Sequence, residues 1–389
     1  MRKLLLICLG LGFAVPSPGA PLPPKRAKVL YQGKSVQQWA DDLRSSDLKV
    51  RKKAAEALGV LGPKARDAVP DLIDVLKGKE AADVSNQEGT AVRLAAIDAL
   101  ARIGRAAVPQ LIDALGTTET TAHQFVMRAL ENMGPEAKRA VPRLTELLQD
   151  KNVLFRIEAA SALYQINRRA DDVLPVLVEG LKDKVGRRAA ALILGRIGPA
   201  AKKAVPPLIE MLKDEGSFAR SSAASALGQI GPAAKPAVPS LLTALKDEDP
   251  FVRASALSAL GDIGWEAKSA LPHLIKALAD PHSGVRGAAA WDLWAIGPDA
   301  KEAVPALISI LQDKDPGVRM AAATAIGQIG PEAKEATAGL VRGLEDQDIS
   351  VRAAATYALH KLGRAAKQAV PQLIAALKDK DDTVRSSAA

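Results

Sequence analysis

The stretch that decides the fold is residues 246–278, KDEDPFVRASALSALGDIGWEAKSALPHLIKAL, because the chain repeats it with small changes over most of its length. In each copy an Arg follows a small or apolar residue, and from Arg187 onward these arginines are 33 residues apart. The arginines are Arg51, Arg93, Arg156, Arg187, Arg220, Arg253, Arg286, Arg319, Arg352 and Arg385, and His123 holds the same place in one further copy. Self-similarity at a fixed period of this size is the signature of a stacked repeat array. Length therefore counts layers, and we expect one elongated domain.

Each copy carries the signals of two helices. Asp249 can cap the first helix, with Pro250 in its first turn. Apolar residues then recur at helical spacing on one face: Ala256, Leu257, Leu260 and Ile263. Gly264 ends this helix, and Pro272 stands in the first turn of a second one. Equivalent prolines along the chain, together with an aromatic content of only 3%, predict an all-α solenoid of about ten helix pairs.

The N-terminus differs from the rest of the chain. Arg2 and Lys3 precede a short apolar run, residues 4–15, and residues 16–20 are small or proline. This is the outline of a secretory signal peptide, which we place at residues 1–20, and the run is too short to span a membrane as a helix. Residues 21–34 are proline-rich and basic and predict a linker, and Ser35 can cap the first helix of a solenoid covering residues 35–389.

The repeat motifs allow a family comparison. They are D-x-x-VR-x-x-A at the start of the first helix, ALG-x-IG at its end, and AVP-x-LI-x-x-L in the second helix. Over residues 35–389 this pattern resembles HEAT repeats, in particular the short-repeat branch named after the phycobilisome lyases. The resemblance implies a right-handed superhelix of the armadillo/HEAT type, with the second helix on the concave side. It also implies that an Asp six residues before the Arg ties neighbouring layers together: Asp150, Asp214, Asp247, Asp280, Asp313, Asp346 and Asp379.

Two segments depart from the regular period. The copies near Pro70 and Arg93 are separated by an insertion, about residues 78–90, which we expect to be an extended surface loop that is either a tolerated insertion or a contact for a partner. The final residues, DDTVRSSAA, match the start of a first helix and then stop, so the last repeat is incomplete.

Residues that could carry catalysis are scarce. The four histidines fall in separate copies, and the single cysteine, Cys8, lies in the predicted signal peptide. Metal sites require clustered ligands, and neither a nucleophile elbow nor a glycine-rich phosphate loop is present. We therefore expect no catalytic residues, metal or cofactor. A lyase or oxidoreductase of the HEAT-like repeat family remains the alternative that the resemblance implies.

Acidic residues recur at one position of the second helix, four residues after its proline. Along the N-terminal half the position is occupied by Asp74, Asp113, Glu146, Glu179 and Glu210, and beyond them by neutral or basic residues. Since the resemblance places this helix on the concave side, the groove would be acidic in its first half and could bind a partner of complementary charge. The alternative is a solvated face with local pairs such as Glu179 with Lys182 and Glu210 with Lys213.

Basic residues recur in the turn before the second helix. They are Arg66, Lys138, Lys202, Lys235, Lys268, Lys301, Lys334 and Lys367, which would line one edge of the stack. Such an edge could attract an anionic polymer or a membrane surface weakly, or could simply be solvated. No aromatic residues interleave with it, so we expect no specific nucleic-acid binding.

Aromatic residues interrupt the pattern in two copies. Trp291 lies five residues after its Arg, about 160° from the buried face, and Trp294 replaces a frequent Gly. Tyr357 and His360 occupy the same two positions two copies later. Exposed aromatic side chains are typical anchors of protein interfaces, although the two tryptophans could also pack on each other.

These observations predict an exported, non-catalytic scaffold of the periplasm, cell envelope or extracellular space. We expect it to bind one or more protein partners. The candidate binding residues are Asp74, Asp113, Glu146, Glu179, Glu210, Trp291, Trp294, Tyr357 and His360.

Overall fold

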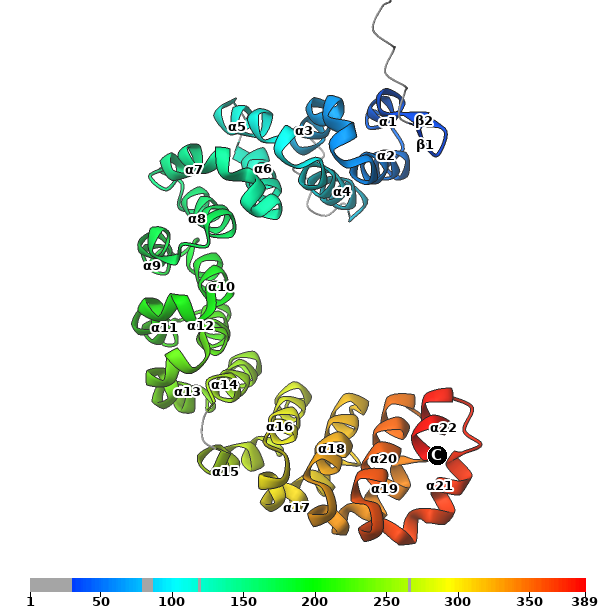
Figure 1. Ribbon diagram of the computed structural model, residues 1–389. Coiled ribbons are helices and arrows are strands. Elements are labelled where there is room, and N and C mark those ends of the chain that lie inside the picture. Colours follow the sequence, from blue (N-terminus) through cyan, green and yellow to red (C-terminus); the bar gives the residue numbers. More distant parts are fainter. Residues whose placement is uncertain (1–29, 79–86, 118–119, 265–266) are drawn as a thin grey trace, which may run out of the picture.

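The computed structural model describes residues 30–78, 87–117, 120–264 and 267–389, and nearly all of these residues are helical. Ten helix pairs stack one on the next, with one short helix before the first pair and one after the last (Figure 1). The predicted all-α solenoid of about ten pairs is therefore confirmed. The predicted signal peptide, residues 1–20, lies outside the described residues.

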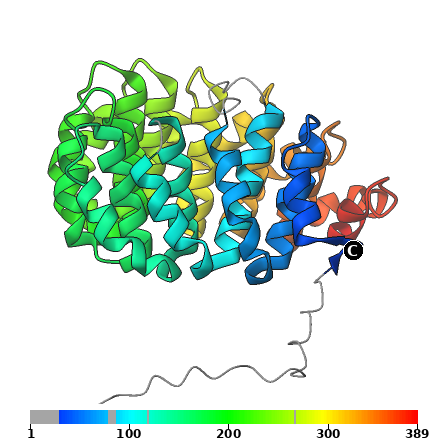
Figure 2. The same cartoon turned by 90° about the horizontal axis from the view of Figure 1, so that it is seen from above.

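The helices form two concentric layers around a C-shaped arc (Figures 1 and 2). The longer, arginine-bearing helices form the inner layer: α2 (Leu48–Leu61), α4 (Gln87–Ile103), α6 (Thr120–Met133), α8 (Val153–Asn167), α10 (Arg187–Ile197), α12 (Ser217–Ile230), α14 (Pro250–Asp262), α16 (Ser283–Ile296), α18 (Pro316–Ile329), α20 (Ile349–Leu362) and α22 (Asp382–Ala388). The outer layer consists of α1 (Val36–Asp42), α3 (Val69–Lys77), α5 (Val108–Thr117), α7 (Val141–Leu147), α9 (Leu174–Gly180), α11 (Val205–Met211), α13 (Val238–Ala244), α15 (Ala267–Ala277), α17 (Val304–Ile310), α19 (Thr337–Gly343) and α21 (Val370–Ala376).

This arrangement corrects one expectation. The family resemblance placed the second, proline-led helix of each pair on the concave side, whereas the structure places it on the convex side. Small residues in the inner helices explain the direction of the curve. A Cβ atom added to Gly228 of α12 would lie 2.9 Å from the Cα of Ala259 in α14, and Gly327 approaches Ala358 equally closely. Because the inner helices can come this near to one another, the stack bends toward them.

The ends of the inner helices follow the predicted signals. The Asp249 side chain accepts a hydrogen bond from the backbone N–H of Phe251 at 2.8 Å, with Pro250 in the first turn. Asp315 caps α18 in the same way. Most of these helices end at a glycine with positive φ, such as Gly231 at 72°, a conformation that other residues rarely adopt. A short 3₁₀ segment then leads into most of the outer helices.

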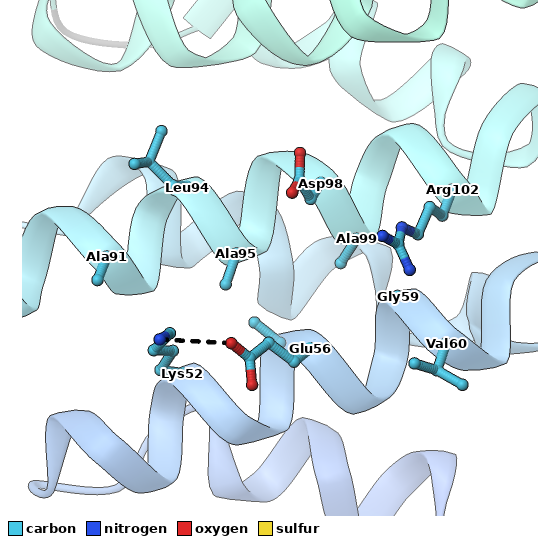
Figure 3. Close-up of a pocket in the computed structure, with 11 residues that line it drawn as sticks. Lys52, Glu56, Gly59, Val60, Ala91, Leu94, Ala95, Asp98, Ala99 and Arg102 are labelled. Carbon is cyan, nitrogen blue, oxygen red and sulfur yellow. Dashed lines mark ion pairs between the residues drawn. The ribbon is translucent and has the colours of Figure 1, made fainter. Parts of the chain in front are cut away.

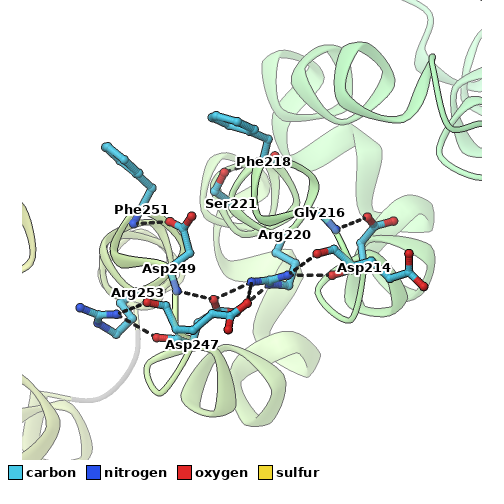
Figure 4. Close-up of polar contacts among 11 residues, drawn as sticks. Asp214, Gly216, Phe218, Arg220, Ser221, Asp247, Asp249, Phe251 and Arg253 are labelled. Atoms are coloured by element: carbon cyan, nitrogen blue, oxygen red, sulfur yellow. Dashed lines mark hydrogen bonds and ion pairs between the residues drawn. The ribbon is translucent and has the colours of Figure 1, made fainter.

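Five of the repeated arginines, from Arg220 to Arg352, hydrogen-bond both to the turn before their own helix and to an Asp in the next layer. Figure 4 shows Arg220 donating from Nε and Nη2 to both carboxylate oxygens of Asp247 in the next layer, each at 2.7 Å. Its Nη1 donates to the carbonyl of Asp214 at 2.9 Å. Such bidentate pairs recur from Arg253 to Asp280, Arg286 to Asp313, Arg319 to Asp346 and Arg352 to Asp379. Arg187 forms an ion pair with Asp214. The Asp–Arg tie between layers is therefore confirmed for six of the seven aspartates, and Asp150 instead faces the layer in which His123 replaces the Arg.

The N-terminal boundary of the fold differs from the prediction. Strands β1 (Leu30–Tyr31) and β2 (Lys34–Ser35) form a small antiparallel hairpin at the end of the predicted linker, residues 21–34. The indole N–H of Trp39 donates to the carbonyl of Tyr31 at 3.1 Å, so the hairpin packs on α1. Hence the last residues of that segment belong to the fold, while Ser35 caps α1 as expected.

The early insertion is shorter than expected where it is described. Residues 87–90 form the first turn of α4 and are not part of a loop. Residues 79–86 of the predicted loop lie outside the described residues.

The apolar core is divided at one junction between layers. One block of buried side chains runs from Trp39 to Ile263, and a second runs from Leu257 to Ala369. Between the blocks, α14 faces α16, and a cavity of about 250 Å³ lies there, bordered by Leu257, Asp262 and Asp292. Asp292 stands six residues after Arg286, where eight other copies have Ala, so a carboxyl replaces a methyl group in this contact. The junction is therefore less completely filled than its neighbours.

Candidate functional site

Large apolar side chains are exposed mainly on the concave face. Eight of the thirteen that the structure exposes lie on inner helices: Val60, Leu94, Leu192, Phe218, Phe251, Trp291, Trp294 and Ile349. The other five are Leu30, Val185, Val370, Ile374 and Leu377, which lie in the hairpin, in the turn before α10 and on the last outer helix. The described parts of outer helices α3 to α19 expose none. Because large apolar groups usually gather on an exposed surface only where something covers them, the concave face is the candidate binding surface.

The sequence pattern explains which residues reach this surface. Side chains two residues before the Arg and five residues after it lie seven residues apart, so they share one face of the inner helix. Phe218 and Phe251 take the first position in α12 and α14, and Trp291 takes the second position in α16. The two phenylalanines are 65% and 63% exposed. Sequence reasoning missed them because it examined only the later position, although the repeat of Phe at the same place was visible.

The predicted aromatic residues lie on the concave face. Trp291 and Trp294 are 41% and 40% exposed, and their rings meet edge to face at 5.9 Å between centroids. The tryptophans therefore pack on each other, as one interpretation expected, and each still exposes about two fifths of its surface. Tyr357 lies on α20, where the Lys361 ammonium sits 5.5 Å from its ring, and His360 is exposed beside it.

The predicted acidic groove is wrong. Asp74, Asp113, Glu146, Glu179 and Glu210 are all exposed, but they lie on outer helices and therefore on the convex side. The helix that carries them was assigned to the wrong layer, so the change from acidic to neutral and basic residues runs along the convex side and not along the groove.

Several of these acids take part in local ion pairs. Glu210 pairs with Lys213 at 3.0 Å, as the solvated alternative predicted, and Glu146 pairs with Arg143 at 2.7 Å. Glu179 pairs with Arg156 at 3.9 Å rather than with Lys182. Exposed pairs of this kind contribute little free energy and point to a hydrated surface.

The N-terminal part of the concave face is charged. A hollow of about 370 Å³ lies between α2 and α4, with Lys52, Glu56, Asp98 and Arg102 around its rim (Figure 3). Lys52 and Glu56 form an ion pair at 3.5 Å, and Leu94 and Val60 supply apolar surface. Positive and negative side chains alternate around the open hollow, so they do not produce a strong electrostatic potential of one sign there.

Two inner-layer carboxyl groups have perturbed acidity. Burial and the nearby Glu131 raise the pKa of Glu158 to about 7. Burial and the nearby Asp262 raise the pKa of Asp292 to about 7. One carboxylate oxygen of each acid is buried without a hydrogen-bond partner. Perturbed acids of this kind occur at catalytic sites, but packing against a neighbouring helix produces the same shift.

The described residues contain no grouping of three His, Cys, Asp or Glu side chains able to hold a metal ion. Nor is any of the described helices long and apolar enough to cross a membrane.

The basic edge is formed as expected where it is described. Arg66, Lys138, Lys202, Lys235, Lys301, Lys334 and Lys367 are exposed in the turns that lead from inner to outer helices. The side chain of Lys268 lies outside the described residues.

Comparison with known proteins places this geometry in a family. The model of HEAT repeats matches residues 109–186, 182–261, 233–294 and 271–360. The model of the PBS lyase HEAT-like repeat matches residues 50–78, 92–117 and 351–379. No curated protein sequence matches significantly.

Solved structures share the fold at low sequence identity. The karyopherin Kap121p, in a mutant crystal structure, superimposes with a TM-score of 0.55 at 16% identity, over 91% of this chain and 44% of that one. The Kap95:Nup1 complex gives 0.54 at 15% identity, over 87% and 52%. The YibA protein of Escherichia coli gives 0.50 at 23% identity, over 70% and 97%. The chain thus spans about half the length of the karyopherins it matches. With family models matching most of the sequence, and stacked helix pairs throughout the described residues, the chain belongs to the HEAT-repeat family.

Proposed function

We propose that the protein is a non-catalytic scaffold that binds a protein partner on the concave face of its solenoid. The observation that carries the proposal is the distribution of exposed apolar side chains, which gather on the inner helices and are missing from the described parts of outer helices α3 to α19. Buried aromatic anchors dominate the energy of most protein interfaces, and the half-exposed pair Trp291 and Trp294 provides such an anchor.

The structural relatives are consistent with this use of the fold. Kap95 has been solved in a complex with Nup1, and Kap121p bound to the extreme C-terminus of the phosphatase Cdc14p. These partners belong to those proteins. They support only the class of function proposed for this chain, since fold similarity alone does not transfer a partner.

The experiment is cross-linking of the protein in its native cells, followed by identification of what is captured. Trp291→Ala should reduce capture at least tenfold, because the anchor is lost while the solenoid stays folded. Glu210→Gln on the convex face is the matched control and should capture as the unchanged protein does. Equal capture by both variants would place the interface elsewhere.

We further propose that the protein is exported, on the strength of the signal-like residues 1–20. Cell fractionation with N-terminal sequencing tests this location. An envelope or secreted form that begins near residue 21 is expected, and a cytoplasmic form that retains residues 1–20 would refute export.

Two other activities can be measured on the same preparation. A lyase or oxidoreductase would show reproducible turnover of a small molecule without a protein partner. Binding of an anionic polymer along the lysine edge would weaken steeply between about 0.05 and about 0.5 M salt, whereas partner binding through an apolar concave face would not.

A further inference from the structure

A cavity of about 300 Å³ opens between the outer helices α13 and α15, which follow one another in the stack (Figure 1). Its floor is formed by Leu257 of α14 and Val285 of α16, both of which are buried. Leu242, Leu245 and Ala277 line its sides. This volume lies at the lower end of the range for pockets that enclose small molecules. The cavity is therefore large enough for a small ligand, and most of its wall is apolar.

The cavity lies at the junction where the apolar core is divided. Leu257 borders both this cavity and the cavity of about 250 Å³ beside Asp292. Well-packed interiors contain few voids larger than a water molecule. Two cavities at one junction therefore mark it as a place where a small molecule can enter the stack.

The rim of the cavity carries positive charge. Lys246 and Lys276 are exposed there, together with His273. Neither ammonium group has a hydrogen bond or an ion pair within the part of the chain that the structure describes. The other two charged residues of the wall compensate each other, since Arg253 donates from Nε and Nη2 to both carboxylate oxygens of Asp280, each at 2.8 Å. The two lysines therefore give the mouth of the cavity a net positive charge.

The neighbouring clefts of the outer layer lack this combination. One layer earlier, the two lysine positions hold Lys213 and Thr243, and Lys213 is paired with Glu210 at 3.0 Å. One layer later, the same positions hold Ala279 and Ser309. Two unpaired ammonium groups above an apolar floor thus distinguish the cleft between α13 and α15 from the clefts on either side.

We infer that this cavity binds a small organic carboxylate with an alkyl body. The alkyl chain would lie against Leu257 and Val285, and the carboxylate would face the ammonium groups of Lys246 and Lys276. Burial of the chain supplies most of the binding free energy, and charge-assisted hydrogen bonds from lysine orient the head group. The inference does not rest on the proposed function, because the mouth of the cavity lies on the outer layer and the candidate binding surface on the concave face.

Other classes of small molecule fit this cavity less well. A cation would be repelled by the two unpaired ammonium groups. An inorganic anion would use the lysines but leave the apolar wall in water, and exposed charges alone bind weakly in salt. A neutral alkyl compound would cover the wall but would offer no charge to the lysines. An alkyl carboxylate satisfies both parts of the site.

The test is calorimetric titration of the full chain with octanoate. Three control ligands each lack one feature: acetate has no alkyl chain, octanol has no charge, and octylammonium has the opposite charge. Octanoate should bind at least about tenfold more tightly than any of the three, because only octanoate uses the apolar wall and the lysines together.

Variants locate the site. The double variant Lys246→Met with Lys276→Met removes the positive rim and should weaken octanoate binding about tenfold. Ala277→Leu adds bulk inside the cavity and should weaken binding by about as much, because the alkyl chain loses its place. Lys213→Met, at the equivalent position one layer earlier, is the matched control and should leave the affinity within about twofold of the unchanged protein. Circular dichroism and thermal melts check that the variants are folded.

Several results would overturn the inference. Octanoate may bind no more tightly than acetate, or equally well to the double lysine variant or to Ala277→Leu; each result would show that the cavity is not the site. Equal weakening by Lys213→Met would indicate general attraction to the basic surface instead. Trp291→Ala, which should reduce partner capture, should leave octanoate affinity within about twofold, so this inference and the proposed function succeed or fail separately.

Discussion

Replacing Arg286 with methionine is expected to lower the free energy of unfolding by about 3 kcal/mol. Arg286 is 8% exposed and donates to both oxygens of Asp313, at 2.6 and 2.7 Å. It also donates to the carbonyls of Asp280 and Pro281, at 2.8 and 3.0 Å. Methionine fills a similar volume, so the loss is mainly that of these hydrogen bonds and of the cation beside Asp313.

The magnitude follows from what remains around Asp313. Removing one partner of a buried ion pair costs about 3 to 5 kcal/mol, because the other charge is left unpaired. Asp313 still accepts a hydrogen bond from the backbone N–H of Asp315 at 3.0 Å, and the pair lies just beneath the surface, where water screens it. Both effects place the cost at the lower end of that range.

The assay is urea denaturation followed by circular dichroism and by tryptophan fluorescence, to which Trp291 and Trp294 contribute from α16. Because a solenoid is held together by contacts between neighbouring layers, the C-terminal block should unfold at a lower urea concentration than the rest. Lys213→Met, which removes the exposed pair with Glu210, is the control and should cost less than about 1 kcal/mol.

A double variant and the pH dependence can refute the reasoning. Arg286→Met with Asp313→Leu removes the unpaired charge, so it should be at least as stable as Arg286→Met alone. The hydrogen bond from Arg286 lowers the pKa of Asp313. Because the pKa of Asp313 is lower in the folded protein, its ionised form stabilises the fold above the ordinary pKa of Asp, and this stabilisation is lost in acid. The difference in unfolding free energy between Arg286→Met and the unchanged protein should therefore shrink below about pH 4. Strictly additive costs, or a constant difference down to low pH, would contradict a coupled pair.

Other substitutions test the packing of the inner layer. Gly228→Ala should lower the stability of the fold by about 1 to 3 kcal/mol in thermal melts, because the new Cβ would lie 2.9 Å from the Cα of Ala259. Gly116→Ala is the control and should cause no loss of stability, because a Cβ there would meet nothing within 4 Å. Asp292→Asn should stabilise the protein above about pH 7. Burial and the nearby Asp262 raise the pKa of Asp292 to about 7, so the unchanged protein should lose stability as the pH rises from about 4 through 7. The variant has no carboxyl group to ionise there and should not lose this stability. A pH-stability curve for Asp292→Asn that parallels the unchanged protein would show that Asp292 ionises without cost.

The repeated residues made the fold predictable from the sequence. Asp249, Pro250 and Gly264 specify where helices begin and end, and the period specifies that the pairs stack. The Arg–Asp ties were also foreseen, through the family resemblance, which implied that the Asp six residues before the Arg ties neighbouring layers together. These features depend on residues that recur at the same positions in most copies.

The direction of curvature was not predictable in the same way. It depends on how closely helices of neighbouring layers approach, and this in turn depends on small residues such as Gly228 and Ala259 that look unremarkable in one copy. Assigning the wrong helix to the concave side moved Glu179 and its equivalents into a groove they do not line. Trp291 was identified correctly as exposed because that inference used only the angle around a single helix.

The positions that build the solenoid and those that face the groove are different, and this separation indicates where recognition lies. Arg286 and its equivalents face neighbouring layers, so substitutions there alter stability. Trp291 and Phe251 face the groove, so they can change without disturbing the stack. Helix α16 departs from the repeat pattern at two positions. Asp292 stands where eight other copies have Ala, and Trp294 stands where five other copies have Gly. Chains usually keep local packing rules except where function requires otherwise. The helix that departs from them also carries the exposed tryptophan pair, which makes α16 the centre of the proposed binding surface.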